Sequence, residues 1–359
     1  MKPEALQSIS RFFLPGFSGT IEPVGSGLIH HTFKLSDACS GKAYALQQVN
    51  TDVFPEPRNL QRNYRYVADA LLNARSRFQL PAIIAGGSGH DLYLESAGQK
   101  PWRMYAWIEN SVTCSSVEDT GRAYAMAGAF GRFSADLLQD DPEKLQPVLP
   151  GFHDLAYRFR QLEAAVKQAE PYRLDPARPV LEQLESYTPL VDFYRRLSSE
   201  AFHFRRYILH HDAKISNILF DKTSGAVLTP VDLDTVMPGC YFSDFGDMVR
   251  SLAPDRDEHT SDCSDLQVRP GHYQALREGY LEQMYDCLTE EERKHFDYSG
   301  LLLAYMQSIR FLTDHLNGDT YYHTDYEGQN LERAVNQCTL LQRLEDFLVG
   351  RYKLVRCSK

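Results

Sequence analysis

The clearest pattern in the chain is a twelve-residue stretch near its middle, Leu209-His210-His211-Asp212-Ala213-Lys214-Ile215-Ser216-Asn217-Ile218-Leu219-Phe220. Its core has the form H-x-D-x-K-x-x-N. A carboxylate, Asp232, follows fifteen residues after Asn217, at the end of an apolar strand pattern. Asp and Asn on loops commonly make only turns and caps. Four matching positions and a spaced fifth carboxylate favour a functional loop over that simpler use.

This pattern resembles the catalytic loop of protein kinases and of the aminoglycoside-phosphotransferase-like small-molecule kinases. The resemblance implies phosphoryl transfer, in which an Asp orients the acceptor hydroxyl and takes its proton while a cation offsets the γ-phosphate charge. An amide and a carboxylate then hold Mg²⁺ against the phosphates. On that logic Asp212 is the base, Lys214 contacts the γ-phosphate, and Asn217 and Asp232 bind Mg²⁺.

A second motif, Asp244-Phe245-Gly246, matches the kinase D-F-G string but lies 27 residues after Asn217, whereas Asp232 occupies the expected metal position. We therefore predict that Asp244 fixes the catalytic loop by accepting hydrogen bonds from its backbone. We interpret Asp247 and Arg250 as an ordinary helix-start carboxylate and an exposed cation.

The composition is that of an ordinary globular protein. The 359 residues are 43% hydrophobic, 24% charged and 12% aromatic, which leaves room for two or three lobes with a sizeable core. The formal charge of −10 opposes binding to nucleic acid or to an anionic membrane surface. Seven scattered cysteines without a C-x-x-C pair indicate neither a disulfide framework nor a zinc site. With no leader or membrane span apparent, we expect a cytoplasmic monomer or weak homodimer.

Hydrophobic periodicity divides the chain into two regions. The first has strand patterns at 20–23, 31–35, 43–49, 81–85 and 102–108, and one amphipathic helix over 59–77. The second has helical patterns over 123–138, 156–169, 180–197, 273–287, 299–316 and 331–348, interrupted by short β-rich runs between 207 and 236. This predicts an α+β protein with a small antiparallel-β N-terminal lobe (1–110) and a larger, mostly helical C-terminal lobe (111–359). Such an arrangement is the bilobal protein-kinase-like fold that the resemblance implies.

The N-terminal lobe carries the residues expected to bind the nucleotide. Gly25 and Gly27 form a glycine-rich turn whose backbone N–H groups can approach phosphates, although alone it could be only a hairpin turn. The other residues assigned to nucleotide binding are His31, Thr32, Gln47, Trp107 and Glu109. Segment 105–110 is the expected hinge, where backbone groups bind adenine. We assign His30 to the glycine loop or cleft wall rather than to a metal.

The lysine and glutamate of a protein-kinase nucleotide site are both missing. Gln47 ends Tyr44-Ala45-Leu46-Gln47, where the kinase motif has its phosphate-binding lysine, and the helix over 59–77 has Asp69 as its only acid. Losing both partners together leaves no unpaired buried charge. We expect Lys214, Gln47 and Arg62 to share the anchoring of the phosphates.

Longer segments resemble the N-acetylhexosamine 1-kinase branch of the same family. These segments are Leu46-Gln47-Gln48-Val49-Asn50-Thr51-x-Val53-Phe54-Pro55-x-x-x-Asn59-Leu60, Trp102-Arg103-x-Tyr105, Asp232-Leu233-Asp234-Thr235-Val236-Met237-Pro238, and Arg310-Phe311-Leu312-Thr313-Asp314-x-Leu316-Asn317-Gly318-Asp319-Thr320-Tyr321-Tyr322. The resemblance runs from about residue 20 to 340. It implies ATP- and Mg²⁺-dependent phosphorylation of the anomeric hydroxyl of GlcNAc or GalNAc. An anomeric hydroxyl is more acidic than an ordinary alcohol, so a single Asp suits it as a base.

The last of these segments supplies the residue types that a sugar site requires. A pyranose has many hydroxyls and one apolar face, which charged or amide donors and an aromatic platform recognise together. The residues assigned to this mixture are Arg310, Asp314, Asp319, Tyr321 and Tyr322, of which Arg310 and the two tyrosines contact substrate along with Asp212. The alternative is an ordinary helix ending at 317–318 with packed tyrosines. Phe152-His153-Asp154 is a further acceptor-side candidate, with Asp154 more simply a cap.

Two other functions stay open. A kinase of another small alcohol, such as choline, homoserine or an aminoglycoside, needs an acidic and aromatic pocket for a cation, which the net charge permits and Arg310 opposes. A non-catalytic pseudokinase scaffold accounts for the missing Lys–Glu pair. Such a scaffold has no use for Asp212, Asn217 and Asp232 together.

Overall fold

The computed structural model describes residues 3–24, 29–87, 89–94, 100–114, 116–197 and 204–358. The chain divides into two compact units. The first unit comprises Met1–Val112, Lys144–Leu149 and Leu219–Asp234, and the second comprises Thr113–Glu143, Pro150–Ile218 and Thr235–Lys359. The first unit therefore includes two short segments from beyond residue 110, where the sequence places the boundary between lobes.

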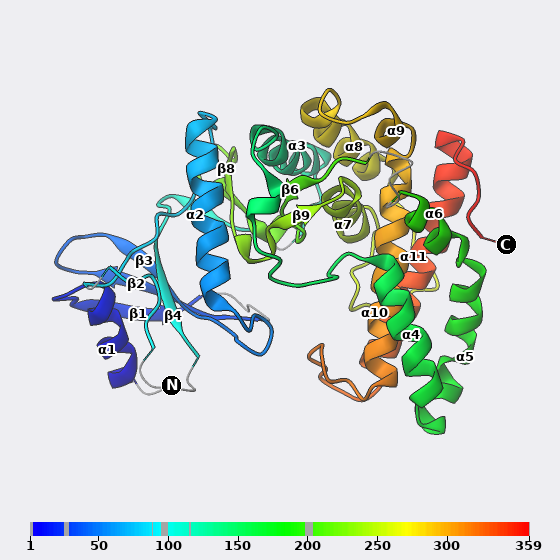
Figure 1. Ribbon diagram of the computed structural model, residues 1–359, viewed down its shortest axis with the longest axis horizontal. Helices are drawn as coiled ribbons and strands as arrows, with labels where there is room; N and C mark the ends of the chain where they lie inside the picture. Colours follow the sequence, from blue (N-terminus) through cyan, green and yellow to red (C-terminus); the bar gives the residue numbers. More distant parts are fainter. Residues whose placement is uncertain are drawn as a thin grey trace. The chain divides into compact units, whose positions relative to one another are not determined.

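The first unit is built on an antiparallel four-stranded sheet in the order β1-β2-β3-β4 (Figure 1). Its elements are α1 (Pro3–Phe13), β1 (Gly19–Pro23), β2 (His31–Asp37), β3 (Ala43–Gln48), α2 (Pro57–Asn73) and β4 (Trp102–Ala106). One face of the sheet packs on α1 in an apolar cluster that includes Leu6, Ile9, Phe13, Tyr44, Leu46, Trp102 and Met104. Because side chains alternate between the faces of a strand, Gln47 of β3 and Arg103 of β4 lie on the opposite face.

A smaller sheet, β5-β7-β8, brings three short strands together. They are β5 (Ser111–Val112), β7 (Ile218–Asp221) and β8 (Val227–Pro230). Strand β8 leads directly into the segment that carries Asp232 and Asp234. This sheet therefore positions both of these carboxylates.

The second unit is mostly helical (Figure 1). Its helices are α3 (Thr120–Asp136), α4 (Leu155–Gln168), α5 (Pro171–Ser186), α6 (Pro189–Leu197), α7 (Phe242–Leu252), α8 (Pro270–Met284), α9 (Glu290–Lys294), α10 (Ser299–Leu316) and α11 (Gln329–Tyr352). Strands β6 (Tyr207–Leu209) and β9 (Met237–Gly239) pair antiparallel. Helix α10 is buried around most of its circumference and packs against α4, α5, α7 and α11, so it forms the centre of this unit.

The predicted α+β architecture is confirmed, with several local corrections. Residues 81–85 form no strand, and only Ile83 makes an isolated bridge, to Tyr105. The helix predicted over 180–197 is two helices, because Pro189 lacks an N–H and disfavours helical backbone at Thr188. The sequence prediction also missed α1, α7 and the short helix α9.

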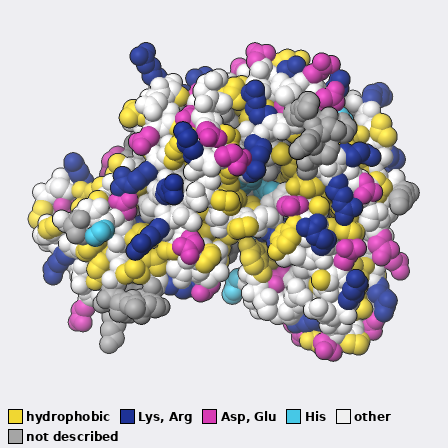
Figure 2. Space-filling model, viewed as in Figure 1, with side chains coloured by type: hydrophobic (Ala, Val, Ile, Leu, Met, Phe, Trp, Pro, Cys, Tyr) yellow, Lys and Arg dark blue, Asp and Glu magenta, His cyan; other side chains and the backbone are white. Residues whose placement is uncertain are grey.

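The surface carries both signs of charge. Figure 2 shows Lys and Arg side chains interspersed with Asp and Glu side chains on the face in view. Within the described part of the chain, no helix combines the length and apolar character needed to cross a membrane.

The contact between α3 and α8 offers a test of packing. A Cβ added at Gly279 of α8 would overlap the carbonyl oxygen of Tyr124 in α3 and lie 3.2 Å from the nitrogen of Gly128. Gly279→Ala should therefore lower the free energy of unfolding by roughly 1–3 kcal/mol, because the two backbones must separate. Gly350→Ala is the control, since a Cβ there meets nothing within 4 Å. Urea unfolding measures both variants, and equal stabilities would contradict the close-approach account.

Candidate functional site

The catalytic loop begins where β6 ends, and a carboxylate of α7 fixes its first turn. His210 and His211 are buried, and His211 has left-handed backbone with a φ of 64°. The backbone N–H groups of both histidines donate to the Asp244 carboxylate, with N–O distances of 3.0 and 2.7 Å. The predicted contact between Asp244 and the loop backbone is confirmed.

Asp212, Lys214 and Asn217 lie together in this loop. The side-chain nitrogen of Asn217 donates to the Asp212 carboxylate at 2.8 Å, and the Lys214 ammonium lies 3.0 Å from the same carboxylate oxygen. Burial acts to raise the pKa of Asp212, but Lys214, His210 and the hydrogen bond from Asn217 outweigh it and lower that pKa. Asp212 is therefore held as a carboxylate. Because the amide nitrogen of Asn217 faces Asp212, its amide oxygen points away, as a ligand for a hard cation must.

Two histidines, buried His211 and half-buried His153, connect the loop to the turn before α4. The Nδ1 atoms of His211 and His153 are 3.3 Å apart, and Nε2 of His211 lies 3.3 Å from the carbonyl oxygen of Met237. Nε2 of His211 therefore carries the hydrogen, and its Nδ1 accepts from Nδ1–H of His153. Burial lowers the pKa of His211 to about 4 and the pKa of His153 well below its ordinary value. Both rings are neutral at neutral pH.

Arg310 of α10 lies among three aromatic rings of the second unit. Its guanidinium is 4.7 Å from the ring centre of Phe152, 5.6 Å from Tyr322 and 6.0 Å from Tyr321. Phe152 in turn stacks on His153 at 4.5 Å. The structure therefore brings together Arg310, Tyr321 and Tyr322, three of the four residues predicted to contact substrate. Phe152 and His153 join this group to the loop that carries the fourth, Asp212.

Asp314 and Asp319 have internal roles, which corrects their assignment to the sugar site. The Asp314 carboxylate accepts from the backbone N–H groups of residues 320, 321 and 322, at 3.0, 2.8 and 2.9 Å. Asp319 pairs with Arg173 at 2.6 Å. Asp314 thus shapes the loop that presents the two tyrosines. Asp154 caps α4 by accepting from the N–H of Tyr157, as predicted.

Arg250 is not the exposed cation that the sequence suggested. Its side chain is only 12% exposed and pairs with Asp247 at 2.8 Å and with Glu258. Asp247 is buried within α7 rather than placed at the helix start, and burial raises its pKa although Arg250 opposes that shift. Asp247 and Asp244 are therefore two buried carboxylates on the helix that supports the catalytic loop.

In the first unit, three strands align a row of polar residues. Thr32 of β2 pairs in register with Gln47 of β3, and Gln47 pairs with Arg103 of β4. Gln47 donates to the Thr32 hydroxyl at 3.0 Å, and its carbonyl oxygen accepts from Nε of Arg103 at 2.9 Å. The Arg103 guanidinium also donates twice to the carboxylate of buried Asp234, at 2.7 and 2.5 Å.

The residues around this row complete the candidate nucleotide side. His30 is buried and bonds Asp234 through Nε2 at 2.7 Å. Asp232 is exposed and has left-handed backbone with a φ of 62°. His31 and Glu109 are exposed, and Lys34 lies 4.8 Å from the ring of Trp107. Gly25 and Gly27 lie outside the described residues. Arg62 is on the exposed side of α2.

Sequence reasoning missed Arg103 and Asp234 as members of the site. Asp234 stands two residues after the predicted metal ligand, and Arg103 stands in a predicted strand among residues of alternating polarity. A buried cation near Gln47 could have been sought once the lysine was seen to be absent. The register between β3 and β4, which makes Arg103 the neighbour of Gln47, is visible only in the structure.

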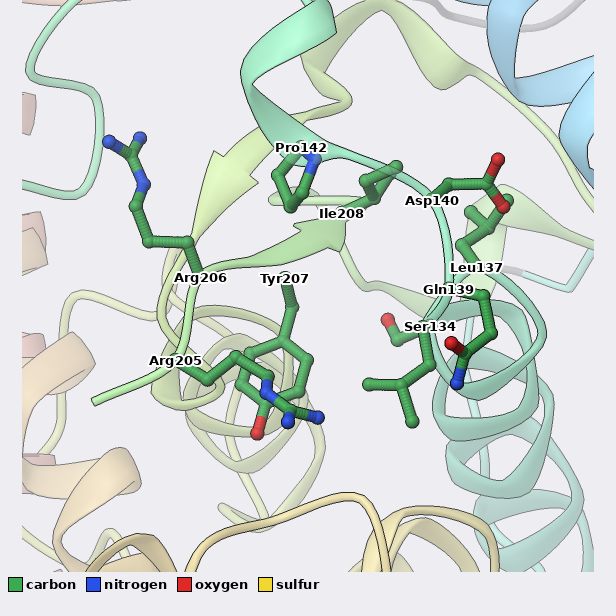
Figure 3. A pocket seen from close by; sticks show the side chains of 10 residues that line it. Ser134, Leu137, Gln139, Asp140, Pro142, Arg205, Arg206, Tyr207 and Ile208 are labelled. Atoms are coloured by element: carbon green, nitrogen blue, oxygen red, sulfur yellow. The ribbon is translucent and has the colours of Figure 1, made fainter. Parts of the chain in front are cut away.

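A pocket of about 310 Å³ in the second unit lies apart from these groups (Figure 3). It lies between the end of α3 and β6, where Arg205 and Arg206 flank Tyr207. The predicted site residues are not among those that line it.

A family model and several solved structures match this chain. The model of the phosphotransferase enzyme family matches residues 20–289. A choline kinase from Cryptosporidium parvum Iowa II is 15% identical, with a TM-score of 0.58 and 98% of each chain covered. A microcompartment-associated aminopropanol kinase is also 15% identical, with a TM-score of 0.58 and 99% of each chain covered. A spectinomycin phosphotransferase solved with ADP and spectinomycin is 11% identical, with a TM-score of 0.56 and coverage of 96% of this chain and 99% of that one. These likenesses confirm the predicted protein-kinase-like fold.

The buried carboxylate of Asp244 predicts a pH dependence of stability. Burial raises its pKa to about 6, so the folded protein holds a proton that the unfolded chain, with an Asp pKa of about 3.9, releases. The contribution of Asp244 to stability is therefore largest at low pH and falls as pH rises from about 4 to 6. Asn does not titrate, so Asp244→Asn does not lose this contribution. As pH rises from about 4 to about 7, its free energy of unfolding should increase by about 2–3 kcal/mol relative to that of the wild type.

Urea unfolding at the two pH values measures this difference for both proteins. Asp192→Asn, at an exposed carboxylate of α6, is the matched control and should change by less than about 0.5 kcal/mol. A stability difference between Asp244→Asn and wild type that is independent of pH would contradict the account.

Proposed function

Because its residues 20–289 match the family model, the chain belongs to the phosphotransferase enzyme family, and we propose that it is an ATP-dependent small-molecule kinase whose acceptor is the anomeric hydroxyl of an N-acetylhexosamine. The kinase assignment is supported by the ionised Asp212 with Lys214 and Asn217 beside it. The observation that carries the acceptor class is the Arg310 cluster, which joins a cation to three aromatic rings.

The proposed chemistry is a single displacement at phosphorus. Asp212 accepts the proton of the acceptor hydroxyl, and the oxygen forms a bond to the γ-phosphorus while the bond from that phosphorus to the β–γ bridging oxygen breaks. The electron pair of the broken bond leaves with ADP. Lys214 offsets charge on the transferred group. Asp212 keeps its base form available because its pKa is lowered, and the acidity of an anomeric hydroxyl makes a weak base sufficient.

The donor side of the reaction suits Mg²⁺ with ATP. The amide oxygen of Asn217 and the carboxylate of Asp232 are hard oxygen donors, which this ion prefers, and they would hold it. When bound, Mg²⁺ neutralises phosphate charge. We assign the glycine-rich turn of Gly25 and Gly27 to the phosphates and segment 105–110 to adenine. The remaining residues proposed to contact nucleotide are His31, Thr32, Gln47, Trp107 and Glu109.

An amino alcohol is the second candidate acceptor, because the similar structures include a choline kinase and an aminopropanol kinase. The charges around the proposed acceptor site oppose it. Arg158 of α4 lies near enough to Arg310 that burial and this second cation lower the pKa of Arg158. Two arginines within one cluster repel an ammonium group, whereas they can donate hydrogen bonds to hydroxyl and acyl oxygens.

A panel of acceptors tests the proposal directly. Coupled ADP release with GlcNAc, GalNAc, glucose, choline, ethanolamine, aminopropanol and spectinomycin would rank the candidates. We expect the N-acetylhexosamines to give the highest kcat/KM, and phosphorus NMR to place the phosphate on C1. Turnover of an amine and none of a sugar would overturn the acceptor class while leaving the kinase assignment intact.

The base assignment predicts the effect of Asp212→Asn. The variant should lose at least about 100-fold in kcat, because the amide cannot take the acceptor proton. Its thermal stability should remain close to that of the wild type. Asp175→Asn, at an exposed carboxylate of α5, is the control and should keep full activity. A kcat of Asp212→Asn within threefold of the wild-type value would remove Asp212 from its role.

The acceptor assignment predicts the effect of Arg310→Ala. Losing the guanidinium should raise the KM for the sugar about tenfold or more, which corresponds to about 1.4 kcal/mol, and leave the KM for ATP unchanged. Arg195→Ala, at an exposed arginine of α6, is the control. Steady-state kinetics with each substrate varied in turn makes the measurement. An unchanged KM for the sugar, or equal changes for sugar and ATP, would contradict the assignment.

A further inference from the structure

We propose that Arg103 is a positioning residue of the nucleotide site: its ion pair with Asp234 replaces the missing Lys–Glu pair and fixes the segment that carries Asp232. This inference rests on the proposed nucleotide site, within which it assigns a role that the sequence left open. Gln47, Arg103 and Asp234 all lie within the first unit.

The geometry of the Arg103 guanidinium is that of a clamp between two partners. On one side Nε and Nη2 donate to the Gln47 carbonyl oxygen, at 2.9 and 2.5 Å. On the other side Nη1 and Nη2 donate to the two carboxylate oxygens of Asp234, at 2.7 and 2.5 Å. Four of its five N–H groups are thus engaged, in a fork that only a planar guanidinium provides. An arginine held in this way orients other groups rather than binding phosphate itself.

Because the Arg103–Asp234 pair is buried, each of the two charges requires the other. Arg103 is 3% exposed and Asp234 is 6% exposed. Arg103 donates to both carboxylate oxygens of Asp234, and Nε2 of His30 donates to one of them. Removing one member would leave an uncompensated charge in the interior. Any movement of Asp234 away from Arg103 is therefore unfavourable.

Asp234 ties three parts of the first unit together. Nδ1 of His30 accepts from the backbone N–H of Asn50 at 3.0 Å, so its Nε2 carries the hydrogen that is donated to Asp234. His30 directly precedes β2, Arg103 lies in β4, and Asp234 itself follows β8 by four residues. The Asp234 carboxylate thus links the start of β2 and strand β4 to the segment after β8.

Asp232 depends on this link because of its backbone. It has a φ of 62°, in the left-handed region that few residues other than glycine adopt. Two residues later the chain is anchored by the Arg103–Asp234 pair. The pair therefore fixes the backbone next to Asp232 and, with it, the direction of a carboxylate proposed to bind Mg²⁺.

The arrangement also differs from the usual pair in the origin of its acid. The kinase glutamate belongs to the helix that α2 replaces here, and the buried polar residue that α2 places near this row is Gln61, an amide 3.3 Å from the hydroxyl of Tyr105. The acid paired with Arg103 instead comes from the segment next to the metal ligand. In this protein the ionic link therefore joins the sheet to the metal-binding segment and does not involve the helix.

Nucleotide binding without any acceptor tests the inference. The probe is a fluorescent ADP analogue, titrated with and without Mg²⁺, against wild type, Arg103→Lys and Asp234→Asn. Arg103→Lys keeps the charge and loses the fork. We expect both variants to bind the Mg²⁺ complex at least about tenfold more weakly, and to need more Mg²⁺ for half-maximal binding, while affinity for the metal-free analogue changes by less than about threefold.

The controls separate positioning from general stability. Arg65→Lys changes another arginine of the same unit that pairs with a carboxylate, Asp91, but its side chain is 53% exposed, so the variant should bind as the wild type does. The double variant Arg103→Lys Asp234→Glu, which restores reach between the partners, should recover part of the Mg²⁺ dependence. Thermal unfolding of every variant is recorded in parallel.

The outcomes distinguish this inference from the function it rests on. A wild-type protein that binds no ADP would refute the proposed nucleotide site. Wild-type binding with Mg²⁺ dependence unchanged in both single variants would refute the role of Arg103 alone. Variants that fail to fold, with no recovery in the double variant, would assign the pair to stability and also overturn the role. Because no acceptor is present, an error in the sugar assignment affects none of these results.

Discussion

The first unit depends on the buried ion pair between Arg103 and Asp234. Moving two charges out of water costs several kcal/mol per ion, and their attraction offsets this only when geometry is good and the remaining polar atoms are bonded. Here Gln47 and His30 complete the bonding, and the partners lie 131 residues apart in the chain. The pair also accounts for the glutamine on β3. A lysine at position 47 would place a second cation beside Arg103, with only the Asp234 carboxylate to balance both charges. The absence of that lysine is therefore linked to the presence of Arg103.

In the second unit the Asp244 carboxylate fixes the first turn of the catalytic loop, and its pKa is raised, whereas that of Asp234 is lowered. Asp244 accepts two backbone N–H groups, but burial outweighs them and the charge of His210, so its pKa rises to about 6. Asp212, supported by Lys214 and Asn217, has its pKa lowered instead. Asp247 shares the burial of Asp244 and is only partly compensated by Arg250. The environment thus lowers the pKa of Asp212 and raises the pKa values of Asp244 and Asp247.

The features that could be predicted from sequence are those that depend on contiguous residues or on a regular hydrophobic periodicity. The spacing from Asp212 to Asn217 lies within one loop, and the role of Asp244 followed once Asp232 had taken the metal position. The partnership of Gln47 and Arg103 could not be predicted in this way, because it depends on strand register across 56 residues, which local sequence does not specify. Asp314 was misassigned because a carboxylate that bonds backbone and one that binds substrate look alike in sequence. The break between α5 and α6 could have been predicted from Pro189 alone.

The proposed acceptor differs from those of the amine kinases that share the fold, and the reason lies in what already occupies the aromatic rings. An aromatic cage binds an ammonium group through the faces of its rings. In this protein the Arg310 guanidinium lies over Phe152, Tyr321 and Tyr322, so an ammonium group would have to displace a cation that belongs to the protein itself. Arg158 adds a second positive charge, and the neutral ring of His153 contributes none. The family match therefore carries the reaction class, while the local positive charge, opposite in sign to the net charge of −10, supports the proposal of a neutral polyol over an amine.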